Sequence, residues 1–137
     1  MLQSKLDYLV LLPNFLAYFG SAAALTALFL VLYTAITPIA EWAQIRAGNA
    51  AAAVSLSGAM LGFALALASV ITHSQSLVDM VAWGAVALVI QLLVFALVRL
   101  AKADLVRRIG DGSMAHAILL AAASVTAGIL NAACMTY

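Results

Sequence analysis

Charge is scarce in this chain, and its absence from long stretches is more informative than its total. Only 8% of the 137 residues are Asp, Glu, Lys or Arg, against about a quarter in soluble domains. Each charge-free stretch can supply the roughly 20 apolar residues with which a helix crosses a bilayer. The sequence therefore predicts an all-α integral membrane protein with four transmembrane helices, in a single membrane domain over residues 1–137. The four stretches are 8–40, 49–72, 80–98 and 117–137.

Other shortages exclude classes of chemistry. The single cysteine, Cys134, excludes an intrachain disulfide and a cysteine metal cluster. No carboxylate lies deep in an expected span, where proton relays usually place one. The chain also lacks a phosphate-binding loop and a nucleophile elbow. We therefore expect that the protein is not an enzyme, holds no cofactor or metal, and binds no nucleic acid.

Lys and Arg are distributed unevenly over the loops. On one side of the membrane the only basic residue is Lys5. Because cytoplasmic loops carry the excess of Lys and Arg, both termini are expected outside, in the periplasm of a Gram-negative cell. His73 and His116 then lie on opposite sides and cannot share a metal. The basic residues of the first and third loops are Arg46, Arg99, Lys102, Arg107 and Arg108.

A proline marks the expected start of the first span. Proline disrupts a helix interior but is tolerated at a helix start. Pro13 is therefore expected to separate the first span from residues 1–12, an interfacial N-terminal segment on the outer surface. The spans are then expected at about residues 14–36, 49–71, 78–100 and 113–135.

Two short segments between the spans mix apolar and polar side chains. Residues 38–48 and 101–110 are predicted to form short amphipathic elements that lie at the level of the lipid headgroups. Tryptophan and tyrosine are enriched at membrane–water interfaces. Trp42, Trp83 and Tyr137 are therefore expected to act as interfacial anchors.

The chain resembles itself at an offset of 64 residues. Phe19-Gly20 falls on Trp83-Gly84, and Gly48 falls on Gly112. At this offset the spans, amphipathic elements and loop glycines of the first half all align with those of the second half. This pattern predicts two tandem two-helix repeats, over about 13–72 and 77–136. Two helices return the chain to its starting side, so the repeats are expected to be parallel and related by an axis along the membrane normal.

Small residues recur at steps of three and four along the second span. Small side chains let helix backbones approach closely in lipid, and Gly58 and Gly62 form a GxxxG motif. Packing within the subunit is the favoured interpretation, while a subunit interface and a pore or ligand-lining groove stay open. The expected packing residues are Ser55, Gly58, Gly62 and Ala66.

Three polar side chains lie inside the expected spans: Ser57, Gln91 and Asn131. A buried amide needs a hydrogen-bond partner in hydrocarbon. We favour a bond between helices for Gln91 and for Asn131, and a substrate or ion pathway is the alternative. The position that matches Gln91 in the first half is Ala27, so only one half carries this amide.

Several short runs of residues occur in order over nearly the whole chain. They are Ile36-Thr37-Pro38, Glu41-Trp42, Ser57-Gly58, Leu61-Gly62, Trp83-Gly84, 88–95 around Gln91, and 131–136 beginning at Asn131. Together these runs resemble the YjfL family of bacterial inner-membrane proteins. The resemblance implies a multi-pass inner-membrane protein built from a duplicated two-helix unit. The family has no known function, so the resemblance implies no activity.

The expected function lies in the bilayer itself. We predict a small oligomeric structural or interaction component of the membrane, whose partners are membrane lipid and further copies of the chain. The alternative is an oligomeric channel or transporter for ions or small solutes, with Ser57, Gln91 and Asn131 lining a polar path. Four short helices are too few to enclose a conduit in one subunit, so this alternative requires a multimer.

Overall fold

A computed structural model describes residues 1–135, and every regular element in that range is an α-helix. Four of the helices are long and apolar enough to cross a membrane, as the sequence predicted. They are α1 (Leu2–Ile36), α3 (Ala50–His73), α4 (Leu77–Ala101) and α6 (Met114–Cys134). The short helices α2 (Glu41–Arg46) and α5 (Leu105–Gly110) occupy the two expected amphipathic segments.

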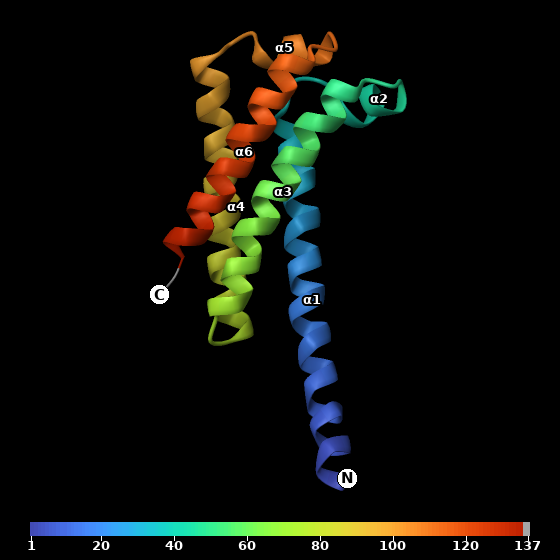
Figure 1. The fold of residues 1–137 in the computed structure, drawn as a ribbon, viewed down its shortest axis with the longest axis vertical. Coiled ribbons are helices and arrows are strands. Elements are labelled where there is room, and N and C mark those ends of the chain that lie inside the picture. The colour runs from blue at the N-terminus through green and yellow to red at the C-terminus, as the bar shows by residue number, and fades with distance from the viewer. Residues whose placement is uncertain (136–137) are drawn as a thin grey trace.

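The helices form a bundle in which α3 and α6 are the central pair (Figure 1). α1 and α4 run in the same direction, toward the end of the molecule that carries both α2 and α5. α3 and α6 return from that end. α1 packs against α4 and α3, and α4 packs against α3 and α6.

The two short helices end in the same kind of turn. Gly48 and Gly112 each have φ of 90°, in the left-handed region that glycine adopts most readily. The N–H of each glycine donates to a carbonyl three residues earlier, Ile45 O and Ile109 O, at 3.0 Å in both turns. The next residue donates to the carbonyl five positions before it, at 2.9 Å in both turns. Asn49 also links the turns, because its Nδ2 donates to Ile109 O at 3.0 Å.

The expected helix break at Pro13 is wrong. α1 runs through this residue, which lies inside the helix. Proline removes one backbone donor, but proline is tolerated in transmembrane helices, where neighbouring groups and small backbone adjustments compensate for the lost bond. The surrounding leucines also favour a helix. That residues 1–12 lie at the membrane interface stays a prediction.

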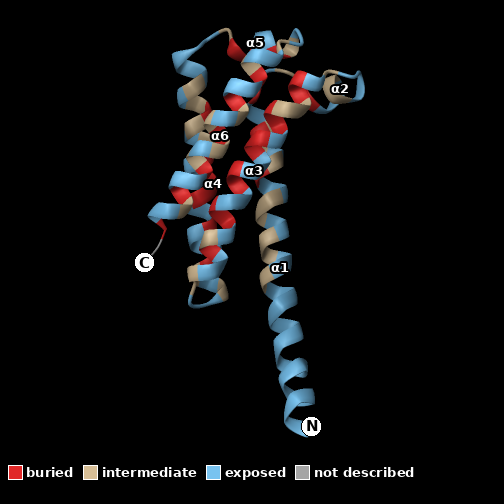
Figure 2. Cartoon of the chain, viewed as in Figure 1, coloured by how far each residue is buried: buried red, intermediate tan, exposed pale blue. Residues whose placement is uncertain are grey.

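Buried residues run along α3 and along the parts of α4 and α6 that pack near it, while α1 contributes only Phe29 and Tyr33 (Figure 2). Phe29 stacks on Phe63 of α3, with ring centroids 4.7 Å apart. Tyr33 packs against Phe95 of α4, with ring centroids 4.8 Å apart. These ring pairs join α1 to both neighbours. Residues 2–17, by contrast, are all exposed.

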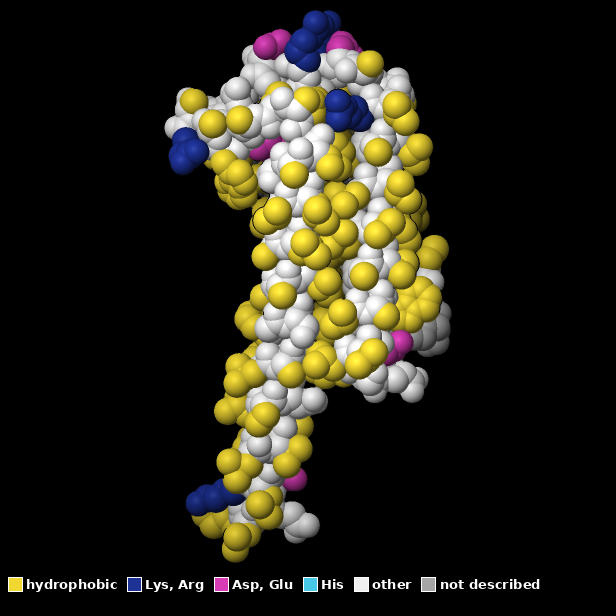
Figure 3. Space-filling view, turned by 180° about the vertical axis from the view of Figure 1, so that it is seen from behind, with side chains coloured by type: hydrophobic (Ala, Val, Ile, Leu, Met, Phe, Trp, Pro, Cys, Tyr) yellow, Lys and Arg dark blue, Asp and Glu magenta, His cyan; other side chains and the backbone are white. Residues whose placement is uncertain are grey.

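The outer surface of the long helices is apolar. Hydrophobic side chains cover the body of the molecule, while most Lys and Arg side chains gather at the end with α2 and α5 (Figure 3). α1 has 35 residues and is therefore about 52 Å long, longer than the roughly 30 Å of bilayer hydrocarbon. Its first half projects well past the connection between α3 and α4 (Figure 1).

Glycine backbones make the closest contact of the bundle. A Cβ at Gly58 would overlap the Ala121 backbone, and a Cβ at Gly62 would overlap Ser124 O. Gly128 on α6 in turn lies against the backbone of Gly62. At these positions the backbones of α3 and α6 lie so close that only glycine fits.

Two faces of α3 are packed. On the face with the small residues, Ser55, Gly58, Gly62 and Ala66 are all buried. Leu67 lies on a different face from these small residues and is only 3% exposed. Its Cδ1 lies 3.5 Å from the position that a Cβ would take at Gly84 of α4. α3 is thus the most enclosed of the long helices.

Gly62→Ala is expected to lower the free energy of unfolding by about 1–3 kcal/mol, because overpacking a tight contact costs roughly this much. The added Cβ would lie 2.6 Å from Gln91 Nε2 and overlap Ser124 O. Gly20→Ala is the matched control, since a Cβ there has nothing within 4 Å. Thermal unfolding in detergent measures both. Equal tolerance of the two substitutions would contradict the α3–α6 contact.

Candidate functional site

Among residues 1–135, and apart from Tyr33 with its buried hydroxyl, six buried residues are polar or charged: Thr37, Glu41, Ser55, Gln91, Ser124 and Asn131. Some of them bond only within their own helix, as Ser55 does when its Oγ donates to Ala52 O at 3.0 Å. The two amides, in contrast, reach across from one helix to another. They define the candidate site, which lies between α4 and α6.

Gln91 lies at the junction of three helices. Its side chain is 3% exposed, and its Nε2 donates to Ser124 O of α6 at 2.8 Å. The same nitrogen lies 2.6 Å from the position that a Cβ would occupy at Gly62 of α3. Gln91 Oε1 has no hydrogen-bond partner within residues 1–135. The amide therefore ties α4 to α6 through one of its two polar atoms, the nitrogen.

Asn131 makes the second bond between these helices. Its Nδ2 donates to Ala87 O of α4 at 3.5 Å, which is long and therefore weak for a hydrogen bond. A shorter bond lies nearby, where Ser69 Oγ of α3 donates to Ala132 O at 2.9 Å. Backbone carbonyls of α6 and α4 thus accept the side-chain hydrogen bonds that join α6 to α4 and to α3.

Ser57 does not join the two amides. Its side chain is exposed, and its Oγ donates to Ala53 O of the same helix at 2.7 Å. The structure therefore brings Gln91 and Asn131 to one helix pair and leaves Ser57 on the outer surface of α3.

The aromatic side chains proposed as anchors lie near the two ends of the bundle. Trp42 is 51% exposed on α2, and Trp83 is 39% exposed in the first half of α4. Tyr137 lies outside the residues that the structure describes.

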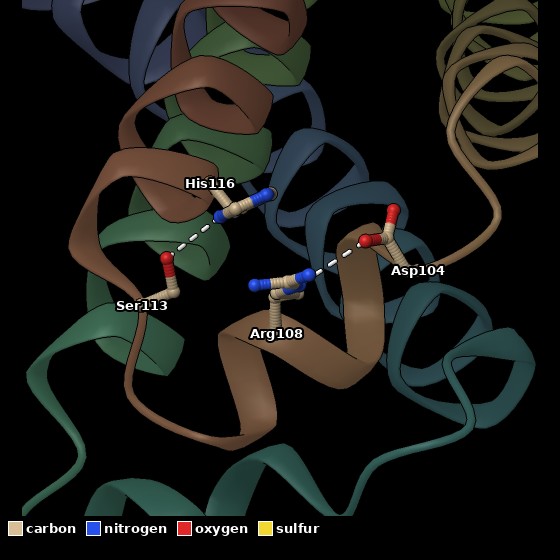
Figure 4. Close-up of polar contacts among 4 residues, drawn as sticks. All are labelled: Asp104, Arg108, Ser113 and His116. Carbon is tan, nitrogen blue, oxygen red and sulfur yellow. Dashed lines mark hydrogen bonds and ion pairs between the residues drawn. The ribbon is translucent and has the colours of Figure 1, made fainter.

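Polar contacts at the end with α5 are local (Figure 4). Arg108 Nε donates to Asp104 Oδ2 at 3.1 Å, between exposed side chains one turn apart. This bond holds the pKa of the Asp104 carboxyl below its usual range. Ser113 Oγ lies 2.6 Å from His116 Nδ1 in the first turn of α6. Over residues 1–135, no group of three His, Cys, Asp or Glu side chains is placed to hold a metal.

One buried group escaped the sequence reasoning. Glu41 belongs to the predicted amphipathic element 38–48, but it is only 2% exposed. The turn after α1 brings Glu41 back against Thr37 and Tyr33. The four-residue spacing of Tyr33, Thr37 and Glu41 is the signal that could have found it.

The chain is similar to known bacterial membrane proteins. Residues 7–135 match DUF350, described as a Domain of Unknown Function. The chain belongs to the DUF350 family. The YjfL resemblance is thereby confirmed: UPF0719 inner membrane protein YjfL of Escherichia coli (strain K12) is 43% identical over 123 residues, 90% of this chain and 93% of that protein.

A second relative of this DUF350 protein comes from a different bacterium. UPF0719 transmembrane protein YshE of Bacillus subtilis (strain 168) is 34% identical over 68 residues, 50% of this chain and 51% of that protein. No solved structure matches the chain. The protein is thus a multi-pass membrane protein whose relatives are named for their membranes, and neither name assigns an activity.

Gln91→Leu is expected to change the free energy of unfolding by about 1 kcal/mol or less, because hydrogen bonds between membrane helices average well below 2 kcal/mol. The change removes the bond to Ser124 O and also the partnerless Oε1, so the two effects oppose each other. Thermal unfolding in detergent or bicelles measures the difference. A loss of several kcal/mol would show that the amide organises the bundle.

Proposed function

We propose that this DUF350 protein is a small, non-catalytic, oligomeric component of the bacterial inner membrane with a structural or interaction role. The centre of the subunit supports this proposal, because glycine backbones of α3 and α6 fill it. The Gln91 side chain bonds to Ser124 O in the same region. A subunit packed in this way presents its free apolar faces outward, to lipid or to other copies.

The proposal includes a tandem duplication with parallel halves. α2 and α5 begin at Glu41 and Leu105 and end at Arg46 and Gly110, so both bounds differ by 64 positions. Their glycine turns have the same hydrogen bonds, and both helices lie at one end of the bundle (Figure 1). Each half would then return to its starting side, as parallel transporter repeats do.

One observation supports the oligomer: a pair of positions that is in contact within the subunit has a matching pair, 64 residues away, that is exposed. Leu25 of α1 packs on Gly84 of α4, whose added Cβ would lie 2.6 Å from Leu25 Cδ1. The positions 64 residues away are Val89 on α4 and Gly20 on α1. Val89 is 53% exposed, and a Cβ at Gly20 has nothing within 4 Å.

A second copy of the chain fits this free face. Val89 of one copy would pack on Gly20 of the next, as Leu25 packs on Gly84 within the subunit. Such a contact joins different surfaces of the two copies and forms a ring if its rotation closes. Small residues permit the close helix approach that association in lipid needs. On α1, exposed small residues recur at steps of three and four: Ala17, Gly20, Ala24 and Ala27.

Cysteine cross-linking is expected to detect this contact. Copies with Gly20→Cys and copies with Val89→Cys, both in a Cys134→Ser background, should form a mixed disulfide in oxidised membranes. Ile129→Cys on α6 is the matched control, because Ile129 is also 53% exposed. Equal cross-linking of Gly20→Cys to both positions, or a monomer in lipid, would contradict the oligomer.

The proposal also includes the orientation of the protein in the membrane. We propose that α2 and α5 face the cytoplasm and both termini face outward, because five of the six Lys and Arg residues accompany the α2 and α5 end. In intact cells, Gln75→Cys in the connection between α3 and α4 should react with an impermeant maleimide. Arg107→Cys on α5 should react only after permeabilisation. The reverse pattern would overturn the orientation.

The alternative function, an oligomeric channel or transporter, is favoured by one atom, the partnerless Gln91 Oε1. A selective path usually needs more polar groups than one amide. We therefore expect no ion or solute flux from the protein in liposomes. A flux that well-folded Gln91→Leu abolishes would replace the structural role with transport.

A further inference from the structure

Glu41 differs from the other acidic residues of the chain. Of five Asp and Glu residues, it alone is buried. Its side chain is 2% exposed, and the neighbouring Tyr33 and Thr37 are 1% and 7% exposed. Thr37 is within hydrogen-bonding reach of the carboxyl, and the Tyr33 hydroxyl lies within reach of its charge. One carboxyl and two hydroxyls therefore share a buried site where α1 meets α2.

The hydrogen bonds of this site favour a neutral carboxyl. A threonine hydroxyl has one proton to donate, and Thr37 Oγ1 donates it to Tyr33 O at 2.7 Å. Thr37 Oγ1 therefore cannot donate to the Glu41 carboxylate, a bond that would lower the pKa of Glu41, without giving up Tyr33 O. Glu41 Oε2 and the Tyr33 hydroxyl have no hydrogen-bond partner within residues 1–135. An ionised carboxylate would leave its buried oxygen unsatisfied, which is costly.

The surrounding charges do not neutralise the carboxyl. Arg99 of α4 donates to Ile36 O at 3.2 Å, and Arg108 of α5 pairs with Asp104. α3 has His73 as its titratable residue, at its far end, and His116 of α6 is bonded to Ser113. Within residues 1–135 no cation of this end forms an ion pair with Glu41, and all of them are exposed: Arg46, Arg99, Lys102, Arg107 and Arg108.

The C-terminal end of α1 also favours the neutral form of the Glu41 carboxyl. Carbonyls at the C-terminus of a helix carry partial negative charge, and α1 ends at Ile36, next to the site. A shallow cavity of about 290 Å³, lined partly by Glu41, Trp42 and Arg46, opens beside it. Water at the membrane surface can therefore deliver a proton to the site.

We propose that Glu41, together with the hydroxyls of Tyr33 and Thr37, forms a proton-binding site at the end of the bundle that carries α2 and α5. Binding joins a proton to the carboxylate and gives a neutral carboxylic acid, which leaves Thr37 Oγ1 bonded to Tyr33 O. Loss of the proton gives an anion to which Thr37 can donate only by leaving Tyr33 O. The site is a property of one subunit and does not depend on the proposed oligomer.

Burial raises the pKa of Glu41 from 4.5 to about 7. The folded chain then holds the proton more tightly than the unfolded chain does, so protonation stabilises the fold. This stabilisation is complete below pH 4.5 and is lost as the pH rises to about 7. The site therefore changes its charge near neutral pH.

Infrared difference spectra of the full chain in lipid, recorded between about pH 5 and 9 to bracket the ordinary and shifted values, test the site. The carbonyl band of a protonated carboxylic acid should disappear with a midpoint near pH 7. Glu41→Gln should abolish the band. Thr37→Val should move the midpoint upward, because the anion loses the hydroxyl that lowers the pKa of Glu41. Asp111→Asn, which changes an exposed carboxyl, should leave the band unchanged.

Thermal unfolding gives an independent measurement. The melting temperature of the parent chain should fall as the pH rises toward neutrality, and Glu41→Gln should remove that part of the fall. Three outcomes would overturn the proposal: a midpoint near the ordinary value of 4.5, a band that persists in folded Glu41→Gln, or a band displaced by sodium at constant pH. The last outcome would make the ligand a metal cation.

Discussion

The contact between the backbones of α3 and α6 positions the rest of the bundle. Gly58 and Gly62 on α3 and Gly128 on α6 leave no side chain between the two helices. In lipid, where water does not drive apolar faces together, such close packing is a main source of helix association. The remaining helices arrange around this pair, and the central polar group, Gln91, bonds to an α6 carbonyl beside it.

That arrangement gives the two halves of the chain different surroundings. α4 lies against α1, α3 and α6, while α1 touches the bundle mainly through its second half. The Gly84 face of α4 is consequently packed, and the matching Gly20 face of α1 is open. The proposed duplication would thus give one helix that completes the subunit and another that remains available to a neighbour.

The spans were predictable because charge is expelled from hydrocarbon over a fixed length. The expected bounds of the last three spans lie within two residues of α3, α4 and α6. The small residues on α3 likewise marked a close helix contact, although not its partner. The expected helix break at Pro13 was wrong, since helix continuity depends on neighbours that no local pattern names.

The sequence by itself determined the number of spans, their approximate ends and the turns at Gly48 and Gly112, because hydrophobic length and backbone conformation are local properties. Only the tertiary structure decided which polar groups are enclosed. Gln91 meets Ser124 across 33 positions of chain, and Glu41 becomes buried when the turn after α1 returns it to the core. Burial of a polar group depends on every helix that packs around it, and so cannot be read from one segment.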